Sequence, residues 1–279
     1  MIRHPARAKG RRYPVEISCV AWMDLLGYGA MLEEVAFDPS NDQAEAAIDR
    51  LQLFQKTVSK AARRDFPAML INDGVAFFRD LSPRSHTVSY VFLERAISIF
   101  DDVNRVEREK SYPGARLIIA VGPRMRMEGV IRDDDIHKES ILARLRKETI
   151  SAIQAVHEAF RSGPIAGFVP ALQANFAFTK AYLADAAGTK GELGGPQCYI
   201  DLALFGGEVP EWLKLSRMQR WSGKGLSAIF GELKSIDREA AKTVSFQGAL
   251  DAVAVSRHLG IMRYPRIVRQ YGGRAAKAI

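Results

Sequence analysis

The chain has 279 residues and a formal net charge of +8, with 47% hydrophobic and 26% charged residues. This balance is typical of a globular protein and excludes wholesale disorder, while the length fits one large domain or two small ones. The two cysteines, Cys19 and Cys198, exclude a disulfide framework and a four-cysteine zinc site, and no apolar run is long enough to span a membrane. We therefore expect a cytoplasmic protein.

Strand-like and helix-like patterns of apolar residues alternate along the chain. In chain order, the predicted elements are a strand at 15–22, helices at 30–35 and 42–64, a hairpin at 68–78, a helix at 85–109, a strand at 116–122, charged helical sequence at 133–160, a short strand at 166–171, a helix at 173–187, a strand at 197–204 and a helix at 240–259. Asn-Asp-Gly at 72–74 favours the tight turn of an antiparallel hairpin. This order predicts an α+β fold with a mixed sheet.

Much of the positive charge lies at the two ends of the chain. Residues 1–14 are basic but lack the apolar stretch of a signal peptide, so we expect an N-terminal arm. The C-terminal tail carries five further basic residues, namely Arg263, Arg266, Arg269, Arg274 and Lys277. A basic chain attracts polyanions such as nucleic acid or small phosphorylated ligands, although both ends can also be plain solvated tails.

Two aspartates stand where predicted strands end. Asp24 closes the first strand, and Asp73 lies at the tip of the hairpin. Carboxylates at neighbouring strand ends repel each other unless a cation lies between them. Magnesium held by one or two carboxylates and substrate phosphates is the usual arrangement for phosphoryl transfer. Each residue also has a local explanation, Asp24 as a helix cap and Asp73 as a turn residue.

Five segments together resemble the catalytic domain of class III nucleotidyl cyclases. They are Met23-Asp24-Leu25-Leu26-Gly27-Tyr28, Asn72-Asp73, Phe77-Phe78, Arg116-Leu-Ile-Ile-Ala-Val-Gly122 and Gln173-Ala174-Asn175. The first two are similar to the family's metal-binding motifs, and Asn175 matches its ribose-contacting asparagine. Thr179 occupies the position of the family's arginine, and Lys180, which follows it, would supply that cation.

The resemblance implies a ferredoxin-like βαββαβ palm sandwich over residues 15–205. It implies a charged helical insertion at about 130–163, and a C-terminal extension at 206–279 packed on the domain. The reaction would convert a nucleoside triphosphate to a 3′,5′-cyclic nucleotide and pyrophosphate.

The same resemblance implies the roles of individual residues. Two Mg²⁺ or Mn²⁺ ions would be held by Asp24, Asp73 and the carbonyl of Leu25. Amides of the following turn would cradle phosphates, and this turn comprises Leu26, Gly27, Tyr28 and Gly29. Lys180 would stabilise the reacting α-phosphate, with Arg116 and Arg124 as weaker phosphate-binding candidates. The active site would lie at a homodimer interface, with Asn175 and Lys180 facing the aspartates of the partner.

Two positions depart from the purine-specific members of the family. Met69 and Phe168 stand where those members place the lysine and aspartate that contact the purine edge. Without such polar groups, selection of adenine or guanine is not expected. The pattern resembles the bacterial Pycsar pyrimidine cyclases, which make cyclic CMP or cyclic UMP in anti-phage defence and thereby activate a separate effector. Cytidine and uridine remain equal alternatives.

Two other hypotheses stay open. The chain can be a catalytically inactive, cyclase-like nucleotide-binding module. It can also be a nucleic-acid binder that uses its basic ends on a palm-like fold, although the nucleoside triphosphate is the favoured polyanion.

Overall fold

The computed structural model describes residues 15–62, 66–81, 88–125, 140–161, 169–206, 209–244, 255 and 258–260. The named helices are α1 (Tyr28–Glu34), α2 (Asp42–Ala61), α3 (Val88–Glu109), α5 (Ala152–Arg161), α6 (Phe176–Ala187) and α7 (Arg238–Val244). The strands are β1 (Val15–Leu25), β2 (Ala68–Ile71), β3 (Gly74–Leu81), β4 (Ala115–Met125), β5 (Cys198–Asp201), β6 (Leu213–Gly223) and β7 (Leu226–Ile236). None of the helices among these residues is both long and apolar enough to cross a membrane.

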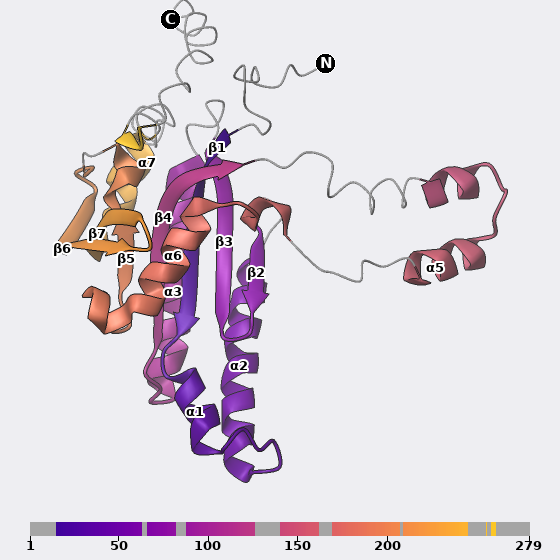
Figure 1. Cartoon of the computed structure of the whole chain (residues 1–279), viewed down its shortest axis with the longest axis horizontal. Coiled ribbons are helices and arrows are strands. Elements are labelled where there is room, and N and C mark those ends of the chain that lie inside the picture. The colour runs from indigo at the N-terminus through magenta and orange to yellow at the C-terminus, as the bar shows by residue number, and fades with distance from the viewer. Residues whose placement is uncertain are drawn as a thin grey trace, which may run out of the picture.

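The described strands form one sheet in the order β2-β3-β1-β4-β5-β7-β6 (Figure 1). The pair β4–β5 is parallel, and the other pairs are antiparallel. The first four strands, with the helices between them, have the order and directions of a ferredoxin-like βαββαβ unit. The predicted α+β palm with a mixed sheet is therefore confirmed.

The central strand β1 is buried on both faces, because its alternate side chains enter two different cores. Met23 and its odd-numbered neighbours pack with α2 and α3, whereas Val20 and Trp22 pack with α6. Asp24 continues the even-numbered series, so its side chain is expected on the face that α6 covers.

Most predicted elements are present, with shifted ends. Asn41 caps α2 as expected, since its side chain accepts a hydrogen bond from the Gln43 amide at 2.9 Å. The strand predicted at 166–171 is wrong where the structure describes it, because Pro170–Leu172 forms a 3₁₀ turn. The long hairpin β6–β7 was missed, and it extends the sheet beyond β5.

Within the charged insertion, residues 140–146 and α5 are helical. They share a small apolar cluster of their own, formed by Ile141, Ile150 and Ala155 with Leu145 packed against it. Figure 1 shows this helical pair apart from the sheet.

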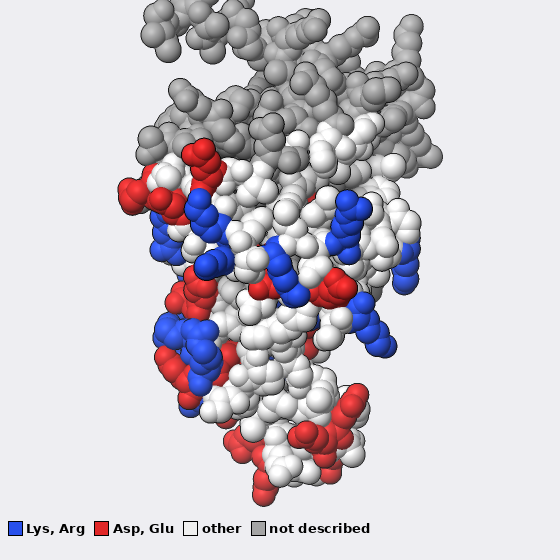
Figure 2. Space-filling model, turned by 90° about the vertical axis from the view of Figure 1, so that its left-hand side faces the viewer, with Lys and Arg blue, Asp and Glu red and all other residues white. Residues whose placement is uncertain are grey.

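The described surface is not uniformly basic. Figure 2 shows red side chains gathered at the lower end of the molecule, where α1 and α2 meet, and blue and red ones interspersed higher up. Exposed acidic residues of that end are Glu33, Glu34, Asp38, Asp42 and Glu45. Exposed basic residues of β6, β7 and their turn are Lys214, Arg217, Arg220, Lys224 and Lys234. The N-terminal arm and the basic tail lie outside the described residues.

Candidate active site

Asp24 and Asp73 come together at one end of the sheet. In the strand pairing, Asp24 lies opposite Gly74 of β3 and opposite Arg116 of β4. The amide of Leu25 donates to the carbonyl oxygen of Asp73 at 3.1 Å, which ties the hairpin tip to the end of β1. The hairpin turn thus brings together two aspartates that are 49 residues apart in the sequence, near enough for the charge of Asp73 to raise the pKa of Asp24.

The turn residues explain how this approach is possible. Asn72 has a positive φ of 51°, and its side-chain amide donates to Asp73 Oδ1 at 3.1 Å. A Cβ atom on Gly74 would lie 2.4 Å from the Trp22 ring and 3.1 Å from Asp24 Oδ1. Only glycine therefore lets the hairpin lie this close to β1 and its aspartate.

The surroundings of Asp24 disfavour its negative charge. Burial, followed by the nearby carboxylates of Asp185 and Asp73, raises the pKa of Asp24 to about 8, and Arg116 offsets only part of this. A bound cation would reverse the balance, because it would favour the ionised carboxylate.

Asp185 of α6 is a site residue that the sequence interpretation missed. It accepts hydrogen bonds from Arg116 Nε at 2.6 Å and from Trp22 Nε1 at 3.2 Å. Arg116 also donates to the carbonyl oxygens of Asp185 at 2.7 Å and Leu193 at 3.0 Å. Arg116 is thus engaged by protein groups, which contradicts its candidacy as a phosphate ligand. The sequence feature that could have identified Asp185 is that it is a carboxylate near the end of a predicted helix otherwise rich in alanine.

Each of the four buried basic residues in the described part of the chain already has an acidic partner. The pairs are Arg50–Glu107, Arg116–Asp185, Arg124–Asp80 and Lys180–Asp201. No buried lysine or arginine among these residues is therefore dedicated to Asp24 and Asp73, and Arg116, which is shared with Asp185, offsets only part of the charge of Asp24. A pair of carboxylate oxygen donors without its own counter-cation fits Mg²⁺ or Mn²⁺, which prefer oxygen ligands and share them with phosphates. Among the described residues no group of three or more His, Cys, Asp and Glu side chains has metal-binding geometry, so phosphates or water would have to complete the shell.

The roles predicted for Asn175 and Lys180 do not fit their contacts. Asn175 is the N-cap of α6, accepting from the Phe178 amide at 3.1 Å and donating to Ser18 Oγ at 2.9 Å. Lys180 is buried, and its ammonium group donates to Asp201 Oδ2 at 2.7 Å and to the Val121 carbonyl at 2.8 Å. Both side chains point into the fold, because α6 turns this face toward the sheet.

The predicted phosphate-binding turn is only partly available. The amide of Leu26 donates to the Gly114 carbonyl at 2.8 Å, so it cannot also bind a phosphate. Gly27 has a positive φ of 72° and precedes α1, a helix of seven residues without a side-chain cap. The carbonyl of Leu25, the predicted third metal ligand, lies next to these two constrained positions.

Two of the three remaining predicted residues can be placed. Arg124 is buried in an ion pair with Asp80, which contradicts its candidacy as a phosphate ligand. Met69 is partly buried on β2 and packs against the Trp22 core, as an apolar side chain would. Phe168 lies outside the described residues.

Aromatic rings gather around Trp22 on the face of the sheet that α6 covers. Trp22 makes edge contacts with Phe178 and Tyr182, at ring-centroid distances of 5.9 and 5.6 Å. Tyr182 remains 50% exposed, whereas Trp22 is buried. An exposed tyrosine thus contacts Trp22, whose ring lies beside Gly74 of the hairpin.

No protein family and no curated protein matches the sequence. Among solved structures, the guanylyl cyclase Cya2 is 9% identical, with a TM-score of 0.49 over 85% of this chain and 98% of the other. A guanylate cyclase domain from Catenaria anguillulae in complex with GTP is 10% identical, with a TM-score of 0.43 over 80% and 98%. An adenylate/guanylate cyclase/hydrolase from Silicibacter pomeroyi is 12% identical, with a TM-score of 0.39 over 80% and 100%. At these TM-scores the likeness carries no argument about activity, which must rest on the site itself.

Proposed function

We propose that this protein is a nucleotidyl cyclase, which converts a nucleoside triphosphate to a 3′,5′-cyclic nucleotide and pyrophosphate. The observation that carries the proposal is the convergence of Asp24 and Asp73, two carboxylates with no dedicated buried counter-cation among the described residues. The sequence resemblance to class III cyclases assigns metal binding to the same two positions.

The aspartates and the Leu25 carbonyl would hold two Mg²⁺ or Mn²⁺ ions together with the triphosphate. When bound, such ions neutralise phosphate charge and lower the pKa of the attacking ribose hydroxyl. The 3′-hydroxyl gives its proton to water and its oxygen attacks the α-phosphorus; the bond from that phosphorus to the oxygen bridging to the β-phosphate breaks, and pyrophosphate leaves. Asp24 and Asp73 would hold the ions, and Asn72 orients one oxygen of Asp73 by its 3.1 Å hydrogen bond.

For the base, we propose a pyrimidine. Met69 packs among apolar side chains and offers no hydrogen-bonding group to a purine edge. A cyclic CMP or cyclic UMP product, acting through a separate effector in anti-phage defence, follows from the resemblance to Pycsar cyclases.

We also propose a homodimer with its site at the interface. The support is the resemblance to class III cyclases alone, since the Lys180 ammonium, the nearest substitute for the family's arginine, is engaged by Asp201 within its own subunit. A cation for the α-phosphate must therefore come from elsewhere in the assembly or from the metal ions.

The decisive experiment is incubation of purified protein with ATP, GTP, CTP and UTP separately in the presence of Mn²⁺, followed by chromatographic separation of products. We expect a cyclic pyrimidine nucleotide. A cyclic purine product would refute the base assignment alone, whereas no cyclic product from any triphosphate would refute the enzyme. Asp49→Asn on the exposed face of α2 is a matched control for substitutions of the two aspartates.

The inactive nucleotide-binding module is the second candidate, and one observation favours it. The polar groups of Asn175 and Lys180 form hydrogen bonds within the fold and do not face an open site. Calorimetry with Mn²⁺ and each triphosphate separates the two candidates, since the module would bind a nucleotide without releasing pyrophosphate.

A further inference from the structure

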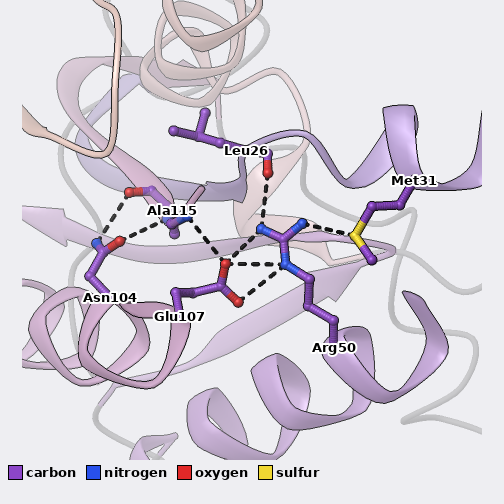
Figure 3. A network of polar contacts seen from close by, with 7 residues as sticks. Leu26, Met31, Arg50, Asn104, Glu107 and Ala115 are labelled. Carbon is purple, nitrogen blue, oxygen red and sulfur yellow. Dashed lines mark hydrogen bonds and ion pairs between the residues drawn. The ribbon is translucent and has the colours of Figure 1, made fainter. Parts of the chain in front are cut away.

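The turn after Asp24 rests on a buried polar network that the proposed reaction does not use directly (Figure 3). At its centre, Arg50 of α2 is 1% exposed. Its guanidinium Nη2 donates to Glu107 Oε2 of α3 at 2.6 Å and to the Leu26 carbonyl oxygen at 2.9 Å. Its Nε completes a two-pronged contact with Glu107, at 3.1 and 3.2 Å from the two carboxylate oxygens.

The hydrogen bonds of this network close into a ring. Glu107 Oε2 accepts from the Gly114 amide at 3.3 Å, and the Gly114 carbonyl accepts from the Leu26 amide at 2.8 Å. Both backbone polar groups of Leu26 are thereby fixed, its carbonyl by Arg50 and its amide by Gly114. The ring joins α2, α3, the turn before β4 and the turn after β1.

Neighbouring contacts stiffen the ring from both sides. Asn104 of α3 bonds both the amide of Ala115 at 2.8 Å and its carbonyl at 3.2 Å. Gly114 has a φ of 94°, and a Cβ there would lie 2.5 Å from Asn104 Oδ1. The Arg50 guanidinium lies over the Tyr112 ring at 4.8 Å and also contacts the Met31 sulfur of α1 at 3.4 Å.

A buried ion pair such as Arg50–Glu107 adds little to the free energy of unfolding. Removing two charges from water largely offsets their attraction, and buried ion pairs replaced by apolar residues of similar volume are often equally or more stable. The planar fork of arginine, however, fixes geometry, because it holds a carboxylate and a carbonyl at once.

We propose that the Arg50–Glu107 pair is a positioning element, which holds the Leu26 peptide and through it the Leu25 carbonyl in register with Asp24. This inference rests on the proposed function, in which Asp24 and the Leu25 carbonyl are metal ligands. Arg50 acts through the backbone and touches neither substrate nor metal.

The test is the double variant Arg50→Met/Glu107→Leu, which removes both charges and keeps an apolar core. We expect it to fold, with amide hydrogen exchange in residues 25–28 at least about 10-fold faster than in the wild type. Mn²⁺ affinity, measured by electron paramagnetic resonance, falls about 10- to 100-fold, as does kcat for cyclisation, because a small displacement of positioned groups has effects of this order. Arg105→Met on the exposed side of α3 is the control and leaves all three quantities unchanged.

A folded double variant with wild-type exchange at residues 25–28 and wild-type Mn²⁺ affinity would overturn the proposal. If the double variant does not fold, Arg50→Lys gives the same test, since one ammonium group cannot hold both Glu107 and Leu26. Hydrogen exchange does not require turnover, so a wild-type protein that makes no cyclic nucleotide refutes the proposed function while the exchange data still decide the role of Arg50.

Discussion

Asparagine in place of Asp24 should stabilise the protein in the absence of divalent metal. Burial and the carboxylates of Asp185 and Asp73 raise the pKa of Asp24 from its ordinary 3.8 to about 8. Below pH 4 the side chain is protonated in the folded and unfolded states alike. Between about pH 4 and 8 the folded state retains a proton that the unfolded state has lost, so stability decreases as the pH rises through this window.

The size of the effect follows from the shift. At about 1.4 kcal/mol per pKa unit, the unfavourable contribution at pH 7 is at most about 4 kcal/mol. The carboxylate is partly exposed, and solvent screening reduces this to about 2 kcal/mol. The amide side chain of the variant has no charge to bury, so Asp24→Asn should recover about this amount and raise the melting temperature by about 4–8 °C at pH 7.

The assay is thermal unfolding of both proteins from pH 4 to 9 in a metal chelator, with Asp49→Asn as the control for loss of an exposed carboxylate. The melting temperature of the wild type should fall more steeply with pH than that of Asp24→Asn. Added Mn²⁺ should stabilise the wild type more than the variant, because the variant has lost a ligand. Equal pH slopes, or a variant less stable than the wild type at pH 8, would refute the assignment of Asp24 as a carboxylate whose charge requires a cation.

Three other predictions concern the same end of the sheet. Asp73→Asn should lower cyclase activity at least about 100-fold while the melting temperature stays within a few degrees, and retained turnover with Mn²⁺ would contradict its role as a ligand. Gly74→Ala should destabilise the protein by about 1–3 kcal/mol in denaturant unfolding, since its Cβ meets the Trp22 ring, whereas Gly29→Ala, with no atom within 4 Å of its Cβ, should not destabilise it. Arg116→Met should cost about 3–5 kcal/mol by leaving Asp185 buried without its partner, and Arg116→Met/Asp185→Leu should regain most of that loss in the same measurement.

Local patterns were sufficient for the first half of the fold. The alternation in β1, the Asn-Asp-Gly turn and the helical periodicity of α2 and α3 each depend on neighbours in sequence. Together they predict an α+β fold with a mixed sheet. The βαββαβ order, which brings Asp24 near Asp73, was implied by the resemblance to class III cyclases.

The β6–β7 hairpin shows where local patterns fail. β6 lies at the edge of the sheet, and most of its side chains are exposed or partly exposed. Its polar sequence, Lys-Leu-Ser-Arg-Met-Gln-Arg, lacks a clear apolar alternation, and a register shift near Leu215 interrupts the pattern further. Pairing with β7 makes it a strand, and that is a tertiary effect.

The ion-pair partners of the buried charged residues also could not be predicted from the sequence. Lys180 and Asp201 are 21 residues apart, and Arg116 and Asp185 are 69 apart. Which face α6 turns to the sheet decides whether Lys180 meets an acidic partner or an open site, and the weakly amphipathic, alanine-rich sequence of α6 does not specify that face.

These pairings change how the net charge of +8 is interpreted. Each buried basic residue of the described chain is paired with an acidic residue of the fold, and only Arg116, which is shared with Asp185, offsets part of the negative charge of Asp24. The acidic end formed by α1 and α2 lies close in sequence to the site and does not neutralise it either (Figure 2). The carboxylates of Asp24 and Asp73 repel each other, and the turn after Asp24 is held in place by Arg50 and Glu107. This arrangement favours a bound cation, which the described chain does not itself supply. The metal dependence of stability is therefore a more direct test of this site than any property of the basic ends.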